Sequence, residues 1–458
     1  MGRRLSSPST GTTVEKHDPY AAIRQPAFVL FTTSRVFSTV GQTLLQAVIL
    51  WQVYDIADSA LSLGFIGLIR FLPALCLSLA GGAAADTYNR KVLVLIAQAI
   101  PLSCAAVLAT ATFGGWVNLE LIYFAVLMLG VASAFDGPAR QSLLPAIVRP
   151  ETFQNAVTVS QTLQALGMLV GPAFGAGIIA VAGVGVAYSV YVAFAAAAFV
   201  TLSLVKYKQI EGQRRGVSLE AVLEGIAFVR TRQVLIGSMS LDMFAVLFGG
   251  AEALLPIYAK DILHAGPVGY GILFSSLSGG ALIMSFLMVF RPPVVNTGKT
   301  LIWSVVAFGA FTVLFGLSHI FVLSVVFYAC LGAADEVSMV MRSTTIQLAT
   351  PDELRGRVSA VSMIFINASN QVGAMESGFV AALTSATFAV VSGGFGAIGV
   401  AGFIGWRLKD LYQYRIPRPG SLVVEAIANV PSTRETEVEG EAEKQKLIEE
   451  IAPAAGGS

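Results

Sequence analysis

Long apolar segments recur along the whole chain, and they constrain the fold more than any other feature. The chain has 458 residues, of which 55% are hydrophobic and only 12% are charged. Soluble proteins carry about 25% charged residues. About 20 mostly apolar residues cross a bilayer as a helix. The sequence therefore predicts an all-α membrane protein with twelve transmembrane helices, near 26–54, 61–84, 90–112, 118–139, 152–181, 184–206, 233–259, 268–290, 299–317, 320–345, 357–383 and 387–409.

The lysines and arginines of the connecting segments are distributed unevenly. Alternate connections carry them, as do both terminal segments, whereas Lys260 is the one clear basic residue in the opposite set. Basic residues concentrate in cytoplasmic loops. Both termini are therefore expected in the cytoplasm, which requires an even number of spans.

The longest internal polar break, residues 207–232, divides six predicted spans from six. Apolar residues recur there at helical spacing, which favours an amphipathic helix on the membrane surface. Two features of the first half reappear about 200 residues later, such as Pro150-Glu151 and then Pro351-Asp352. Two parallel repeats are typical of transporters whose halves rock about a central site. The predicted units are a cytoplasmic tail 1–25, six-helix bundles 26–206 and 233–410 joined by the cytoplasmic linker 207–232, and a largely disordered cytoplasmic tail 411–458.

The segment between the second and third spans carries a recognisable motif, Gly82-Ala-Ala-Ala-Asp86-Thr-Tyr-Asn-Arg90-Lys91. It resembles the signature Gly-x-x-x-Asp-Arg-x-Gly-Arg-Lys of the major facilitator superfamily, although Thr87 and Asn89 depart from it. The resemblance implies the major facilitator fold and a cytoplasmic latch between this loop and the start of the eleventh span. The residues expected in this gate are Gly82, Asp86, Arg90, Lys91, Asp136, Arg140, Asp335, Arg342, Arg355 and Arg357.

Further stretches narrow the resemblance to one branch. Pro138-Ala-Arg-Gln-Ser-Leu-Leu-Pro145 and Arg355-Gly-Arg-Val-Ser359 are similar to the bacterial transmembrane secretion effector branch, which includes enterobactin exporter-like proteins. A small-residue pattern in the fifth span, formed by Gly167, Gly171, Pro172 and Gly175, resembles the export-associated motif of superfamily antiporters. Ordinary helix packing explains the same pattern equally well, because small residues let helices approach closely.

Charged and amide side chains inside the spans are candidates for a site, because charges at membrane depth are costly and tend to face a cavity. Amides and one arginine predict a substrate cavity lined by Arg35, Gln42, Gln46, Gln161, Gln164, Asn367 and Gln371. Arg70 is open to a structural role or to snorkelling towards the membrane surface. Three intramembrane carboxylates without an obvious local partner, Asp242, Glu252 and Glu376, are candidates for proton coupling, and interhelical hydrogen bonding is the alternative for them.

The leading functional hypothesis is a proton-coupled exporter of a small amphipathic molecule such as a siderophore, macrolide or drug. An importer or lysophospholipid carrier of the same fold and a non-transporting membrane sensor are the alternatives. The three histidines and three cysteines form no catalytic or metal-binding pattern, so neither an enzyme nor a metal or other cofactor is expected. A net charge of +1 gives no reason to expect a nucleic acid partner. We expect a monomer in the bacterial cytoplasmic membrane.

Overall fold

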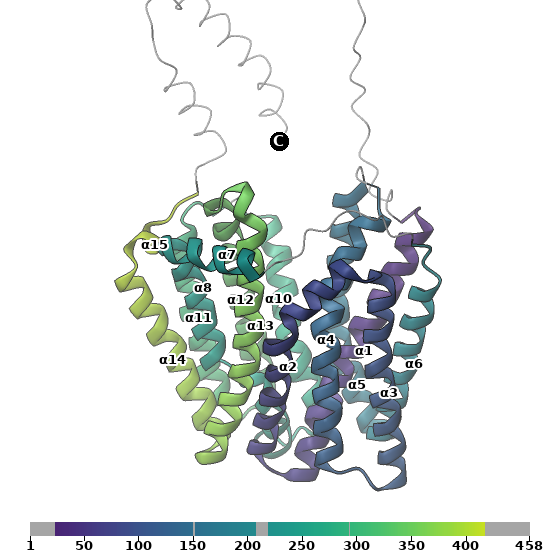
Figure 1. Cartoon of the computed structure of the whole chain (residues 1–458). Coiled ribbons are helices and arrows are strands. Elements are labelled where there is room, and N and C mark those ends of the chain that lie inside the picture. The colour runs from purple at the N-terminus through teal and green to yellow at the C-terminus, as the bar shows by residue number, and fades with distance from the viewer. Residues whose placement is uncertain (1–22, 150–151, 208–218, 293, 417–458) are drawn as a thin grey trace, which may run out of the picture.

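The computed structural model describes residues 23–149, 152–207, 219–292 and 294–416. Most of both predicted tails, part of the linker and the Pro150-Glu151 repeat feature lie outside these residues. The described part contains helices and no strand, which agrees with the all-α prediction (Figure 1).

Six long helices follow the first six predicted spans. They are α1 (Pro26–Ala57), α2 (Ala60–Thr87), α3 (Arg90–Gly114), α4 (Leu119–Ile147), α5 (Phe153–Ala182) and α6 (Val184–Ser203). Their ends follow from local chemistry. The Asn89 side chain accepts hydrogen bonds from the first backbone N–H groups of α3, and Asn118 does so for α4. Gly115 ends α3 at a positive φ of 72°, a conformation that glycine adopts without strain.

The second part of the chain contains more elements. They are α7 (Leu219–Thr231), α8 (Gln233–Phe248), η2 (Ala251–Leu254), α9 (Leu255–Ile257), η3 (Tyr258–Ile262), α10 (Gly266–Val289), α11 (Thr297–Leu317), α12 (Phe321–Ala349), α13 (Asp352–Leu383), α14 (Ala386–Arg407) and α15 (Lys409–Gln413).

The predicted seventh span is not one regular helix. It is broken at Gly249 and Gly250, and a 3₁₀ turn, a short α-helical turn and a π-helical turn continue it as far as Ile262. A Cβ atom on Gly250 would lie 2.7 Å from the carbonyl oxygen of Gly373 in α13. Close backbone approach therefore accompanies the break, and it requires glycine at this point.

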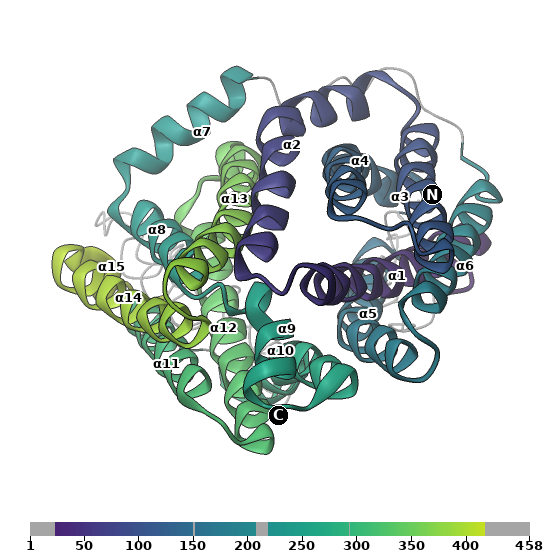
Figure 2. The same ribbon diagram turned by 90° about the horizontal axis from the view of Figure 1, so that it is seen from below.

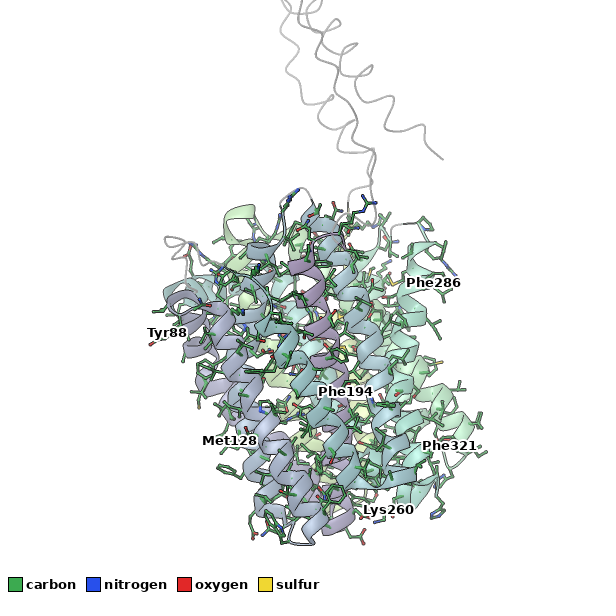
Figure 3. The ribbon with its side chains drawn as sticks, turned by 90° about the vertical axis from the view of Figure 1, so that its right-hand side faces the viewer. Tyr88, Met128, Phe194, Lys260, Phe286 and Phe321 are labelled. Carbon is green, nitrogen blue, oxygen red and sulfur yellow. The ribbon has the colours of Figure 1, made fainter. Side chains whose placement is uncertain are left out.

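Ten helical segments in the described part of the chain are long and apolar enough to cross a membrane. Helices α2 and α13 are 28 and 32 residues long and run in the same bundle; Ala60–Pro73 of α2 forms a shorter apolar segment, and α13 is the more polar of the two helices. Large apolar side chains such as Phe286 and Trp303 are 65% and 64% exposed, and Figure 3 shows Phe286 projecting from the side of the bundle. Such outward apolar surface fits lipid contact. A count of twelve crossings stays a prediction.

The packing of the helices repeats. In the first half α1 packs on α5 and α6, α4 on α2 and α3, and α3 on α6. In the second half α8 packs on α13 and α14, α12 on α10 and α11, and α11 on α14. Helices α2 with α13 and α5 with α10 connect the halves, as Figure 2 shows. Two parallel copies would give this pattern, although the domain boundaries themselves stay a prediction.

One end of the bundle is called the tail side here, because α1 begins there and α15 ends there; the other end is the opposite side. Helix α7 lies across the tail side in Figure 1 and packs on α13 and α8. Glu224 of α7 forms an ion pair with Arg357 of α13. The predicted amphipathic helix therefore rests on the second half of the bundle.

Candidate functional site

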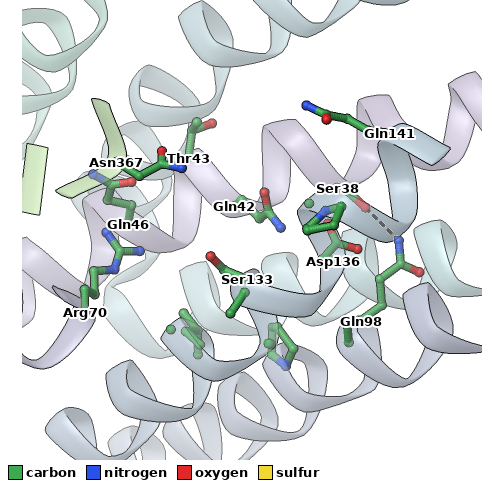
Figure 4. Close-up of a pocket in the computed structure, with 18 of the residues that line it drawn as sticks. Ser38, Gln42, Thr43, Gln46, Arg70, Gln98, Ser133, Asp136, Gln141 and Asn367 are labelled. Carbon is green, nitrogen blue, oxygen red and sulfur yellow. Dashed lines mark hydrogen bonds between the residues drawn. The ribbon is translucent and has the colours of Figure 1, made fainter. Parts of the chain in front are cut away.

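A cavity of about 790 Å³ lies among α1 to α6 and α13, with the side chains drawn in Figure 4. Its lining reaches the tail-side ends of α2, α4 and α13 at Gly82, Gln141 and Gly356. Gln46 and Arg70 line its deep end, towards the opposite side. Apolar side chains such as Phe37, Phe71, Leu129, Met168 and Met363 alternate with amides and hydroxyls on the wall. This mixture suits an amphipathic small molecule.

Four of the predicted cavity residues line this cavity: Gln42, Gln46, Asn367 and Gln371. Arg35, Gln161 and Gln164 lie outside its lining. Arg35 instead donates a hydrogen bond to the side chain of Gln164, which links α1 to α5. The sequence shows which residues share a helix, but it does not show how each helix is rotated.

A polar cluster at the deep end joins the two halves. Gln46 Nε2 donates a 2.6 Å hydrogen bond to Oε1 of Glu252, the second residue of η2, just beyond the break in the seventh span. Arg70 interacts electrostatically with the same carboxylate. Figure 4 shows Arg70 beside Gln46 in the cavity, so Arg70 does not snorkel to the membrane surface. In the sequence, Arg70 is recognisable as a candidate site residue because it is a charged residue in an otherwise apolar part of α2.

Two other intramembrane carboxylates are each paired with an arginine of the same half. Asp242 of α8 forms an ion pair with Arg342 of α12, and both side chains are buried. Asp242 has no local partner in the sequence, as expected, but packing supplies a distant one, because residues 100 positions apart meet only through helix packing. Asp136 and Arg140 form a bidentate pair one turn apart in α4, with distances of 3.0 and 2.7 Å. Asp136 lines the cavity wall.

The remaining acidic candidates have polar neighbours within the second half. The carboxylate of Glu376 in α13 accepts a hydrogen bond from Ser377 at 3.5 Å. Asp335 is followed in α12 by Glu336, whose carboxylate accepts a hydrogen bond from Ser285 of α10. Neither Glu376 nor Asp335 lines the cavity.

The residues of the signature loop bind carbonyl groups of the first half. Arg90 donates to the Ser142 carbonyl at 3.1 Å, and Lys91 donates to the Ser203 and Val205 carbonyls at 2.7 Å. Basic side chains near the C-terminal carbonyls of a helix stabilise its end. The Asp86 side chain lies outside the described residues, so the latch to Arg355 and Arg357 stays a prediction. Arg355 is exposed at the start of α13.

The small residues of α5 face two neighbouring helices. Cβ atoms on Gly167, Gly171 and Gly175 would lie 3.1, 1.9 and 2.9 Å from side-chain atoms of α1. A Cβ atom on Gly271 of α10 would lie 3.4 Å from the carbonyl oxygen of Pro172. The pattern therefore allows close packing of α5 on α1 within the first half and on α10 across the halves.

Contacts between the halves gather towards the opposite side. Lys260 Nζ lies 3.1 Å from Asp55 Oδ1, Tyr54 donates a hydrogen bond to Asp261, and the Lys260 ammonium lies 5.5 Å from the centre of the Tyr54 ring. Figure 3 shows Lys260 at this end of the bundle. We call the Tyr54, Asp55, Lys260 and Asp261 cluster the opposite-side latch.

The backbones of the two halves also meet near this end. A Cβ atom on Gly378 of α13 would lie 2.3 Å from the Cα atom of Gly64 in α2. The Tyr270 hydroxyl donates to the Ala47 carbonyl at 3.1 Å, which joins α10 to α1. The halves are therefore closely packed on the opposite side, while the cavity lining extends to the tail side.

Comparison with known proteins identifies the family with this architecture. The family model described as transmembrane secretion effector matches residues 17–416. The chain is 24% identical over 405 residues to the enterobactin exporter EntS of Citrobacter koseri, covering 86% of this chain and 94% of that protein. It is 23% identical over 265 residues to macrolide efflux protein A of Streptococcus pyogenes, a match that covers 57% of this chain and only 65% of the relative's length.

Solved structures show the same fold. The nucleoside transporter NupG, solved as a point mutant, matches with a TM-score of 0.67 at 12% identity, over 83% of this chain and 99% of that one. A bacterial homologue of the human lysosomal transporter Spinster, solved inward-facing and unoccupied, matches with a TM-score of 0.63 at 12% identity, over 84% and 95% of the two chains. With the family match over most of its length, the chain is a multi-pass membrane protein that belongs to the transmembrane secretion effector family of major facilitator transporters.

Proposed function

We propose that the protein is a secondary active exporter of a small amphipathic molecule, coupled to protons and working by alternating access. The observation that carries the proposal is the cavity of about 790 Å³, whose lining extends to the tail side while the halves are packed together on the opposite side. A transporter alternates between two such arrangements about one site. The names of the enterobactin and macrolide relatives favour export.

Glu252 is our leading candidate for the coupling carboxylate. It bonds to Gln46 across the halves and follows a break in its helix, and broken helices often build the binding sites of transporters. Arg70, Tyr270 and Tyr328 are the charged and titratable groups that act on it electrostatically. A proton on Glu252 changes the strength of a contact between the halves, which is the link that coupling needs. Asp242, by contrast, is neutralised by Arg342 within one half.

The membrane setting completes the proposal. The protein would reside as a monomer in the bacterial cytoplasmic membrane, with both termini in the cytoplasm. The tail side of the cavity would then face the cytoplasm. The basic Arg90 and Lys91 at this end fit that orientation.

Transport by sealed membrane vesicles tests the proposal. Everted vesicles with an acidic interior should accumulate an exported substrate, such as a labelled siderophore, and a protonophore should abolish accumulation. The E252Q variant should lose gradient-driven accumulation but keep passive exchange. Gradient-driven uptake into right-side-out vesicles would instead show an importer, and accumulation by E252Q equal to that of the natural protein would remove Glu252 from coupling.

A further inference from the structure

Arginines deep inside the bundle differ in how their charge is satisfied. Arg35 bonds to Gln164, Arg140 to Asp136 and Arg342 to Asp242. Among the residues that the structure describes, no hydrogen bond or ion pair reaches Arg70, whose one interaction is the longer-range attraction to Glu252. A guanidinium has five N–H donors and is expensive at membrane depth unless acceptors surround it.

The same arginine is one of only two charged residues that line the described cavity. The other, Asp136, is neutralised by the bidentate contact with Arg140. Glu252 is not part of the lining, and its carboxylate is held by Gln46. A molecule that enters the cavity therefore meets a guanidinium at the deep end, while the acid that balances this charge lies outside the lining.

Neighbouring groups complete a recognition site around Arg70. Gln46 and Asn367 project into the cavity close to it in Figure 4, and both carry amide donors. Phe71, Leu129 and Met363 supply apolar wall. An arginine fork binds planar oxygen pairs in a bidentate manner, which a neutral amide or a cation cannot match.

From this arrangement we propose that Arg70 anchors the transported molecule, and that the cavity selects amphiphiles that carry a carboxylate or a comparable anionic oxygen group. The anionic group becomes the close partner that Arg70 lacks among the described residues, while the apolar body of the molecule packs on the cavity wall. Glu252 acts as an internal competitor for the guanidinium and sets the affinity for the anion. The inference rests on the proposed transport function, because it names the substrate class of that function. Its test, however, measures binding alone.

Equilibrium binding of three probes of the same shape tests the proposal. Naphthylacetate, naphthylacetamide and naphthylethylamine differ in charge and share the aromatic body. Each is titrated calorimetrically into the full chain in nanodiscs, with empty nanodiscs subtracted. The acetate should bind about tenfold more tightly than the amide, as expected for a charge-assisted hydrogen bond, and the amine should bind most weakly.

Variants separate recognition from folding. R70Q should abolish the preference for the acetate, R70K should keep part of it, and E252Q should tighten acetate binding because the competing carboxylate is gone. R35Q is the matched control, since Arg35 is also intramembrane but lies outside the cavity lining, and it should keep the preference. Misfolding of E252Q would not explain a gain of affinity for the acetate.

Several outcomes would overturn the inference. They are acetate binding no tighter than amide binding, equal probe selectivity in R70Q and R35Q, or weaker acetate binding in E252Q. No measurable binding of the acetate would also count against it. Because no gradient is applied, failure of the export or proton-coupling proposal would leave these results unchanged.

Discussion

The two ends of the bundle use charge in different ways. On the tail side, the ion pairs whose two side chains the structure describes lie within one half, as with Asp136–Arg140 in α4 and Glu224–Arg357 between α7 and α13. On the opposite side, Lys260–Asp55 and the Tyr54–Asp261 hydrogen bond connect one half to the other.

The first kind of contact stabilises the fold of each half. The second kind stabilises one conformational state of the transporter relative to the other. Pairs within a half can persist while the halves move, but the opposite-side latch has to break before the cavity opens at that end. Substitutions within a half should therefore change stability, whereas substitutions across the halves should change the balance between states.

The largest effect is expected for the buried pair within the second half. Arg342→Ala leaves Asp242 as a buried carboxylate without its partner, because the two side chains are only 8% and 9% exposed. Removing one member of a buried pair costs about 3–5 kcal/mol of stability. The unfolding midpoint in detergent should fall strongly, and a double Arg342→Leu, Asp242→Leu variant should recover much of the loss. An unchanged midpoint in Arg342→Ala would contradict the pairing.

A smaller but more specific effect is expected where the backbones of the halves touch. Gly378→Leu would push α13 away from Gly64 of α2. Overpacking costs about 1–3 kcal/mol, which shifts an equilibrium between two states by a factor of about 5–150. The transport rate should fall by a comparable factor while each half stays folded. Gly399→Leu is the control, because a Cβ atom there has nothing within 4 Å. Equal rates in the two variants would speak against a closed opposite side.

The opposite-side latch should contribute less. The Lys260 and Asp55 side chains are 36% and 55% exposed, so their ion pair is worth about 0.2–1 kcal/mol. Lys260→Gln should change the transport rate by up to about fivefold, and high salt should erase the difference because ions screen exposed pairs. Exchanging the charges, with Asp55→Lys and Lys260→Asp together, should restore the rate. A Lys260→Gln effect that survives high salt would point to another role for this lysine.

The smallest effect is expected for the linker helix. The Arg357 and Glu224 side chains are 39% and 54% exposed. Glu224→Gln should therefore change the free energy of unfolding by only a few tenths of a kcal/mol. Thermal unfolding of the variant and of the natural protein measures this directly. A large destabilisation would show that α7 is an integral part of the second half rather than a helix resting on it.

Much of the fold follows from the sequence, because length and hydropathy alone locate a membrane helix. Each predicted span falls on a helical segment of the structure, with most ends shifted by a few residues and the end of α4 by eight. The break in the seventh span was missed, although Gly249-Gly250 was visible, because two adjacent glycines also occur inside unbroken helices, as at Gly393-Gly394 in α14.

The site was predictable only in part. Amides spaced along one face of a helix pointed to Gln42 and Gln46, and these do line the cavity. Arg35 has a comparable spacing but turns to Gln164 of α5. The partners Asp242–Arg342 and Gln46–Glu252 are 100 and 206 residues apart. Such pairs depend on which helices pack together and in what rotation, and hydropathy carries no information on either.

The central claim is that the opposite side is closed in this structure and has to open during transport. It is tested by cross-linking an Asp55→Cys, Lys260→Cys variant in which the natural Cys76, Cys104 and Cys330 have been replaced by serine. A short thiol-specific cross-linker should join the new pair across the halves, stop transport in vesicles and leave equilibrium binding of a cavity probe intact. Reductive release of the linker should restore transport. Full transport in quantitatively cross-linked protein would contradict the account.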